Sequence, residues 1–382
     1  MSRLGIYVHV PYCVRKCLYC DFYTEGANRA EWDKYVTAIQ RELRHRLADY
    51  GSREDEYTLY IGGGTPSLMP ESQLQRLADG ITGFMHKTPI EFTIEVNPDD
   101  VTASRADAWR SSGVSRISMG VQSLVDSELR AIGRRHDAGT ARKAYNILRP
   151  RFDNISLDII FGLPYQTLDT LDETITGMLA MNPEHISAYS LMYEERTALT
   201  HLRDTGRIPE TEEDITVEMY RKLSRRLAET DYEQYELSNY AHAGFRSQHN
   251  SAYWHGVPYI GLGAGAHSYN GSDRRTFCIN DAASYTRIWN SDDTATAAVR
   301  LYQEEMLSMD EQREEMIMTR LRTREGLELE EYRRKYGDKE YDRMMRIART
   351  FVGQETAAVD NGHLHLTRRG VMVSDEVISA LF

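Results

Sequence analysis

The first two hundred residues alternate between short apolar runs and longer segments whose apolar residues recur at helical spacing. The apolar runs are rich in valine, isoleucine and tyrosine, which favour strands. The expected strands are residues 5–10, 57–61, 91–96, 116–120, 156–161 and 185–190. The expected helices between them are residues 31–48, 71–85, 102–111, 123–132, 140–148 and 168–181. This alternation predicts consecutive parallel β/α units.

Six such units predict an α/β fold with an open or partial (β/α)6 TIM-like barrel, because a closed TIM barrel has eight units. We expect residues 1–235 to form this core domain. In either arrangement, ligands bind at the carboxyl ends of the strands. Functional side chains are therefore expected where each apolar run ends.

The pattern changes beyond about residue 195. Residues 214–229 read as an amphipathic helix and 232–238 as a strand or extended segment. We expect residues 236–300 to form a connecting segment. Its glycine-rich run, 259–268, resembles a loose dinucleotide fingerprint, but no strand–helix unit frames it. Close packing of the backbone against a neighbour is the better interpretation.

Residues 301–382 are charged and mostly helical in pattern. The expected elements are helices at 304–321, 328–336, 341–352 and 374–381, with a short strand at 364–367. Helices followed by a small β element predict a winged-helix-like domain. Residues 302–382 contain 13 Lys and Arg against 17 Asp and Glu. A docking module or lid is therefore expected rather than a DNA-binding domain.

The composition narrows the class of protein. Hydrophobic residues make up 41% and charged residues 27% of the chain, as in ordinary globular proteins. The formal net charge of −12 argues against a nucleic-acid partner. No signal peptide is visible, and no stretch approaches the roughly 18 apolar residues of a membrane helix. We expect a cytoplasmic protein with at most peripheral membrane association.

Three of the four cysteines, Cys13, Cys17 and Cys20, follow the first expected strand with the spacing C-x3-C-x2-C. Three thiolates in one short loop can bind a common metal centre. They are too few to close a tetrahedral zinc site, but they suit a cubane iron–sulfur cluster with one open iron. The alternative is three unrelated thiols. Cys278 is expected to be a buried or idle thiol.

Other candidates follow later strands. Gly62 to Gly64 let the backbone approach a ligand closely. The alternatives are a tight turn and a phosphate-binding loop. The G-K-[ST] signature of a phosphate-binding loop is missing here. Glu95 could accept hydrogen bonds from an amine or a ribose, or could be a solvated carboxylate. Gln122 follows the fourth strand, and Arg134 lies on the segment after it.

Two further residues stand in unusual surroundings. Asp158 interrupts an apolar strand, and a buried carboxylate needs a partner such as an arginine or a ligand hydroxyl. His249 lies near Tyr253 and Trp254. It is either an axial metal ligand in an aromatic-lined pocket or a hydrogen-bonded structural histidine.

Together these motifs resemble the radical S-adenosylmethionine (SAM) superfamily. The resemblance rests on the cysteine motif with Tyr19 before its last cysteine, and on a GGGTP loop at 62–66. It continues through residues 95–98, 119–122, 157–164 and the H-N-x-x-Y-W motif at 249–254, and so covers most of the chain. The chain is similar to the oxygen-independent coproporphyrinogen oxidase group, and most closely to its HemW branch of haem chaperones.

The resemblance implies roles for particular residues. Cys13, Cys17 and Cys20 would bind a [4Fe–4S] cluster, whose open iron would chelate the amine and carboxylate of SAM. Tyr19 matches the aromatic residue that flanks the adenine. His249 matches the residue linked to haem binding. The SAM-site positions are matched by Tyr7, Gly63, Gly64, Thr65 and Glu95. Positions that the oxidase uses for SAM, partly for a second molecule, are matched by Gln122, Arg134 and Asp158.

Two departures favour the chaperone branch over the oxidase. The oxidase has a further cysteine where this chain has Phe22. It also has an extension of several dozen residues before the cluster loop, which we do not expect here because the first ligand is residue 13. The resemblance therefore implies a protein that binds haem and delivers it to apo-haemoproteins of the respiratory chain.

Two other functions stay open. One is a radical enzyme acting on a porphyrinogen or another tetrapyrrole, in which an electron from the cluster cleaves SAM to a 5′-deoxyadenosyl radical. The other is a partner-binding protein whose cluster is a redox switch.

Overall fold

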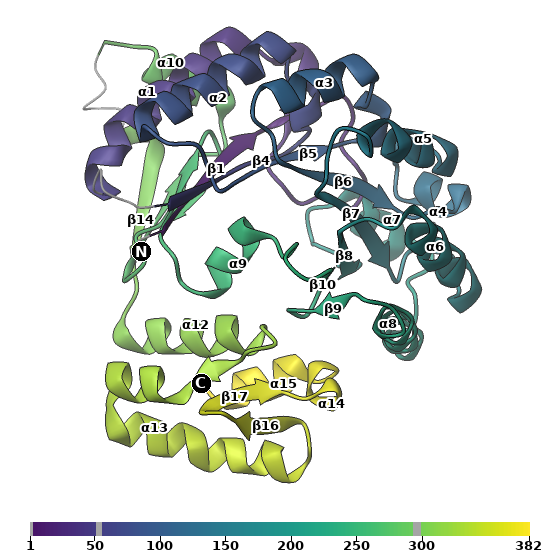
Figure 1. The fold of residues 1–382 in the computed structure, drawn as a ribbon, viewed down its shortest axis with the longest axis vertical. Coiled ribbons are helices and arrows are strands. Elements are labelled where there is room, and N and C mark those ends of the chain that lie inside the picture. The colour runs from purple at the N-terminus through teal and green to yellow at the C-terminus, as the bar shows by residue number, and fades with distance from the viewer. Residues whose placement is uncertain (1–2, 51–55, 293–298) are drawn as a thin grey trace.

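The structure is a computed structural model that describes residues 3–50, 56–292 and 299–382. A curved, mixed sheet of twelve described strands dominates it (Figure 1). The strands lie in the order β14-β13-β12-β11-β1-β4-β5-β6-β7-β8-β10-β9.

Six consecutive β/α units form the centre of this sheet. The strands run parallel to one another and are β1 (Arg3–Val10), β4 (Glu56–Gly63), β5 (Glu91–Val96), β6 (Arg116–Gln122), β7 (Ile155–Phe161) and β8 (His185–Ser190). The helices between them cover the outer, convex side of the sheet (Figure 1) and are α1 (Trp32–Tyr50), α2 (Glu71–Met85), α3 (Ala103–Ser111), α4 (Asp126–Ala131), α5 (Ala138–Leu148) and α6 (Leu168–Met181). The predicted partial (β/α)6 barrel is confirmed.

Residues 233–306, which include the segment expected to be a connection, 236–300, extend the sheet at both edges. After α7 (Ala198–Asp204) and α8 (Glu213–Ala228), the short strands β9 (Glu233–Gln234) and β10 (Asn239–Ala241) continue the sheet beyond β8. On the other side, β11 (Tyr259–Leu262) pairs parallel to β1. Next to it come the antiparallel strands β12 (His267–Tyr269), β13 (Arg274–Cys278) and β14 (Tyr302–Met306). The proposed domain boundaries stay a prediction.

Two helices in the segment 236–300 each begin after an N-capping residue. In α9 (Gln248–Trp254), Ser247 caps the first turn and the Glu91 carboxylate accepts from the N–H groups of Gln248 and His249, both at 3.0 Å. The helix lies on the inner side of the curved sheet (Figure 1). In α10 (Ala282–Trp289), Asp281 is the N-cap.

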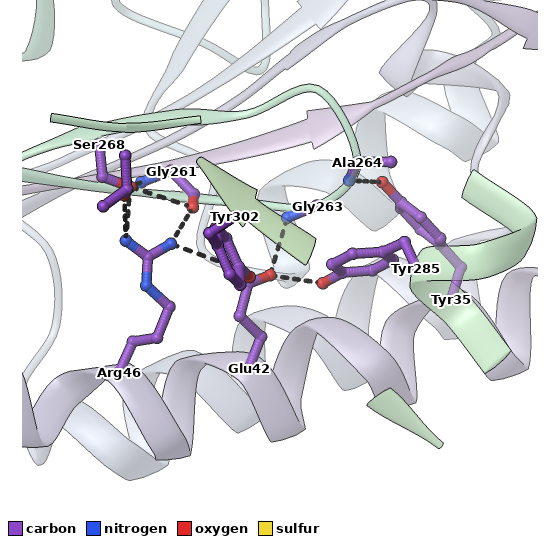
Figure 2. A network of polar contacts seen from close by, with 10 residues as sticks. Tyr35, Glu42, Arg46, Gly261, Gly263, Ala264, Ser268, Tyr285 and Tyr302 are labelled. Carbon is purple, nitrogen blue, oxygen red and sulfur yellow. Dashed lines mark hydrogen bonds and ion pairs between the residues drawn. The ribbon is translucent and has the colours of Figure 1, made fainter. Parts of the chain in front are cut away.

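The glycine-rich run packs directly against α1 (Figure 2). The Gly261 carbonyl accepts from Arg46 at 2.9 Å, and the Gly263 N–H donates to Glu42 at 2.9 Å. A Cβ added to Gly261 would lie 2.0 Å from the carbonyl oxygen of His267. These contacts confirm that the run serves close backbone packing.

The C-terminal part has its own hydrophobic core, centred on Ile317, Tyr332 and Leu364. Its helices are α12 (Met309–Leu321), α13 (Leu329–Gly353), α14 (Arg368–Val371) and α15 (Ser374–Ala380). They pack with a three-stranded sheet, β15 (Leu327–Glu328), β17 (His363–Leu366) and β16 (Ala357–Asp360). The two helices expected at 328–336 and 341–352 are α13, interrupted at Gly337, whose φ is 86°.

One element differs from the sequence prediction. The helix expected at 304–321 begins only at Met309, because Ser308 and Glu311 form a capping box there. The preceding residues form β14, which pairs with β13. No helix in the described part of the chain is long and apolar enough to cross a lipid bilayer.

Candidate functional site

The cysteine loop lies at the carboxyl end of β1. It is closed at its base by pairing of β2 (Tyr12–Cys13) with β3 (Glu25–Gly26). Farther along the loop, the Leu18 N–H donates to the Ile132 carbonyl at 3.1 Å, and the Leu199 N–H donates to the Leu18 carbonyl at 2.8 Å. Segments that follow β6 and β8 therefore fix its conformation.

Cys13, Cys17 and Cys20 are free thiols in this loop. Burial and the neighbouring cysteines together raise the pKa of Cys13, and they raise the pKa of Cys20 to about 11. Metal binding would release these protons. Among the described residues, no three His, Cys, Asp or Glu side chains are arranged to bind one metal ion. Cys17 lies close enough to Cys13 and Cys20 to raise the pKa of both thiols, and in a cubane cluster each thiolate binds a different iron.

Two polar groups from other units contact the cysteine sulfurs. The Thr65 hydroxyl donates to Cys13 Sγ at 3.3 Å. The guanidinium of Arg134 donates to Cys17 Sγ at 3.4 Å and to the Gly120 carbonyl at 2.6 Å. Both donors would stabilise thiolate ligands. The loop is therefore organised by the ends of β4 and β6.

The glycine loop after β4 lies directly against the cysteines. The Gly64 N–H donates to the Val10 carbonyl at 2.7 Å. A Cβ on Gly64 would lie 3.0 Å from Cys13 Sγ and 2.9 Å from the Tyr12 carbonyl. Gly63 has a φ of 112°, which disfavours other residues. The alternative of a simple tight turn does not account for this approach.

Glu95 ends β5 beside this loop. Its carboxylate accepts from the Tyr60 hydroxyl at 2.9 Å and from the Gly63 N–H at 3.0 Å. Burial raises the pKa of Glu95 to about 7. The Tyr7 ring centroid lies 6.0 Å from that of Tyr60, and the Tyr7 hydroxyl bonds to His9 Nδ1 at 3.0 Å. Four of the predicted SAM residues, Tyr7, Gly63, Gly64 and Glu95, are thus held around one strand end.

Two further predicted SAM residues are Gln122, the last residue of β6, and Tyr19, which lies in the cysteine loop. Gln122 has a φ of 67° at an irregularity in the β6–β7 pairing. The ring of Tyr19 packs against a small apolar cluster that includes Ile132 and Leu163. Burial raises the pKa of Tyr19, and Arg134 opposes that shift.

Asp158 has different partners from those expected. It accepts from the hydroxyls of Ser118 at 3.0 Å and Ser156 at 3.3 Å rather than from an arginine. These serines lie opposite each other on adjacent strands, so their hydroxyls reach the same carboxylate. Arg116 acts on Asp158 only electrostatically, and burial still raises the pKa of this carboxyl.

His249 is buried in α9 and both of its ring nitrogens have partners. Nδ1 bonds to the Thr58 hydroxyl at 2.8 Å, and Nε2 bonds to the Tyr253 hydroxyl at 2.8 Å. Burial lowers the pKa of His249 to about 3. This geometry favours the structural alternative. Its role as a haem ligand stays a prediction that requires one hydrogen bond to open.

Sequence reasoning missed a cavity of about 780 Å³ that adjoins the cysteine loop. Its walls come from the loop, from β11 to β13, from the end of α9 and from α12 and α13. Because these elements are far apart in the chain, no local pattern could indicate it. The only sequence feature that points to the cavity is His255, which lines it and directly follows the motif at 249–254.

Comparisons with known proteins agree with this geometry. The model of the Radical SAM superfamily matches residues 7–176, and that of the HemN C-terminal domain matches residues 307–373. The heme chaperone HemW of Bacillus subtilis is 33% identical over 98% of both chains. The chain belongs to the HemW family. The heme chaperone HemW of Escherichia coli is 35% identical over 70% of both chains.

The fold of this HemW family member is also that of a solved radical SAM enzyme. Coproporphyrinogen III oxidase (HemN) from Escherichia coli superposes with a TM-score of 0.81, covering 100% of this chain and 90% of that chain. At 19% identity, this likeness shows the fold alone. The cofactors of the radical SAM family, a [4Fe–4S] cluster and SAM, fit the donor set of the cysteine loop and the glycine cradle beside it.

Proposed function

We propose that the chain is a haem chaperone that binds haem and delivers it to apo-haemoproteins of the respiratory chain. The observation that carries this proposal is the cavity of about 780 Å³ beside the cysteine loop, in a chain related over its length to proteins named heme chaperones. Its volume lies within the range of cofactor sites, about 300–1,000 Å³. Phe22, which replaces the further cysteine of the oxidase, is 64% exposed and lines this cavity.

The chain's own residues would organise two cofactors. Cys13, Cys17 and Cys20 would hold the [4Fe–4S] cluster, while Thr65 and Arg134 donate to two of their sulfurs. Tyr7, Gly63, Gly64 and Glu95 would surround SAM. In radical SAM enzymes the reduced cluster supplies the electron that cleaves SAM; here we assign both cofactors a structural or regulatory part in haem handling.

We also propose a cytoplasmic location. Four free thiols, three of them in one loop, persist most readily in a reducing compartment. Peripheral contact with a membrane would bring the chain to respiratory acceptors.

Haem transfer tests the proposal. The haem-loaded chain and an equal concentration of free haem are each mixed with an apo-b-type cytochrome, and formation of the holo-cytochrome is followed by absorbance. Faster transfer from the loaded chain supports the proposal. Transfer no faster than that from free haem contradicts delivery.

A second function is favoured by the position of the cavity. Tyr7, Phe22 and Tyr23 place it next to the cysteine loop, where a radical enzyme would bind its substrate. The reconstituted, reduced chain is incubated anaerobically with coproporphyrinogen III and SAM, and 5′-deoxyadenosine and decarboxylated product are measured. We expect no decarboxylation; efficient turnover would establish the enzyme instead.

A further inference from the structure

The cavity beside the cysteine loop has walls suited to a flat, apolar ligand. Phe22, Trp254, Tyr259 and Met318 line it. Phe22 and Met318 are 64% and 40% exposed, so each presents an apolar side chain without a protein partner covering it. Helix α9 contacts α12 and lies between the sheet and the C-terminal part (Figure 1).

The cationic side chains at this cavity differ in whether a carboxylate of the protein already pairs with them. Arg275 pairs with Glu315 at 2.5 Å, and Arg320 pairs with Glu331 at 3.6 Å. Lys335 is exposed and lies over the Tyr336 ring at 5.2 Å. Within the described part of the chain, no carboxylate forms an ion pair with it. Lys335 is therefore the cation free to meet a carboxylate on a ligand.

Three histidines line the cavity, and His249 bonds to Tyr253, which also lines it. His9 uses both ring nitrogens: Nε2 donates to the Tyr23 carbonyl at 3.0 Å and Nδ1 accepts from Tyr7. His249 also uses both nitrogens. The His267 ring packs edge-on against Phe277, with centroids 4.7 Å apart, and no described residue hydrogen-bonds to it. The contact with Phe277 therefore helps to orient this ring.

His255 has a different arrangement. Its Nδ1 lies 2.7 Å from the carbonyl oxygen of Ser251. A carbonyl only accepts, so Nδ1 carries a proton, and the neutral form of the ring presents its lone pair at Nε2. Iron- and zinc-binding histidines adopt this state, in which the other ring N–H donates to a carbonyl or carboxylate and fixes the ring.

The backbone around His255 is also fixed. His255 is the C-cap of α9, and its N–H donates to the Ala252 carbonyl at 3.2 Å. The preceding carbonyl, that of Trp254, accepts from Arg320 of α12 at 2.9 Å. The imidazole is exposed, so a ligand can reach it without moving the helix.

We propose that haem binds in this cavity with His255 Nε2 as an axial ligand to its iron and with Lys335 paired to a propionate. The proposal rests on the proposed function and names its site. A haem presents an apolar macrocycle, two carboxylates and an iron that takes nitrogen or sulfur ligands. The apolar walls match the macrocycle, Lys335 matches a propionate and His255 matches the iron. His255 thereby takes the role that the family resemblance suggested for His249.

Haem titration of four forms of the reconstituted, full-length chain tests the ligand: the unmodified chain, His255→Gly, His267→Ala and His249→Ala. We expect His255→Gly to lose the histidine-ligated absorbance spectrum and to bind haem at least tenfold more weakly. Added imidazole should restore the spectrum, since it can occupy the vacated position. His267→Ala should keep the histidine-ligated spectrum, because His255 remains in place.

The outcomes separate the site from the function. If the unmodified chain binds no haem, the proposed function fails and the site with it. If the unmodified chain binds haem and His255→Gly keeps the same spectrum and affinity, the site is wrong while the function stands. Loss of ligation in His249→Ala or His267→Ala alone, with the fold intact by circular dichroism, also overturns it.

The dimethyl ester of haem tests Lys335. The unmodified chain should bind haem more tightly than the ester, and Lys335→Ala should lose most of this preference. Lys339→Ala is the matched control, because Lys339 does not line the cavity. An unchanged preference in Lys335→Ala would show that the propionate pairing is wrong.

Discussion

Arg134 donates a hydrogen bond to the sulfur of Cys17 across 3.4 Å, although 117 residues separate the two in the chain. The same guanidinium holds the Gly120 carbonyl at 2.6 Å, which fixes it at the end of β6. A residue that the family resemblance suggested for SAM thus contacts a predicted cluster ligand. A cation that donates to a thiolate stabilises the more negative, reduced cluster more than the oxidised one.

Replacing Arg134 with glutamine should therefore lower the cluster's reduction potential, by an amount on the order of tens of millivolts. A redox titration followed by electron paramagnetic resonance measures this. Arg105→Gln is the control, because Arg105 donates to the Ser67 carbonyl and not to a cysteine. Equal shifts of the reduction potential in both variants would show that Arg134 has no specific effect on the cluster.

Glu95 should make SAM binding depend on pH. Burial raises its pKa to about 7, so the carboxyl is mostly protonated at pH 6 and mostly ionised at pH 8. Only the ionised form attracts the positive sulfonium and amine of SAM. Anaerobic equilibrium dialysis should show binding that tightens by up to about tenfold between these pH values. Glu95→Gln should bind weakly with a flatter profile; a profile as steep as that of the unmodified chain would contradict this role.

The central fold was predictable because its signals are local. Each β/α unit pairs an apolar run with a helical pattern, and the helix at 71–85 agrees with α2 at both ends. The expected helix at 304–321 was wrong at its start, because Gln303 to Glu305 have no alternating pattern and form β14 only by pairing with β13. Helix α9 was missed since its seven residues are too few to show a helical period.

The candidate site was predictable only in part. The cysteines and the glycine loop have distinctive spacing, and the fold brings them into contact. The serine partners of Asp158 depend on the register of β6 against β7, which the sequence does not state. The arrangement of His255 depends on a carbonyl four residues earlier and on a cavity formed by distant elements.

His249 should contribute mainly to stability. His249→Ala removes its bonds to Thr58 and Tyr253 and leaves a void in a buried position, so the free energy of unfolding should fall by about 2–4 kcal/mol. Urea denaturation measures this. His267→Ala, an exposed change without a lost hydrogen bond, should stay within about 0.5 kcal/mol. Unchanged stability with lost haem binding would instead favour the axial-ligand interpretation of His249.

Glu42 should be the most sensitive position of the network in Figure 2. Its fully buried carboxylate accepts from Arg46 at 3.1 Å, from the Gly263 N–H at 2.9 Å and from the Tyr285 hydroxyl at 2.5 Å. Glu42→Ala removes the carboxylate that pairs with the buried Arg46 guanidinium, so unfolding should become easier by about 3–5 kcal/mol. Glu31→Ala, which breaks the exposed pair with Lys34, should cost less than about 1 kcal/mol. Similar losses of stability in both variants would mean that burial of the network adds little to the free energy of unfolding.

The most direct test of the account is a haem titration of the anaerobically reconstituted chain, followed by the Soret absorbance while the cluster absorbance is monitored. We predict saturable binding at a fixed ratio of haem to protein, with a shifted Soret band and an intact cluster. Binding that rises without saturation, with the spectrum of free haem, would contradict the account.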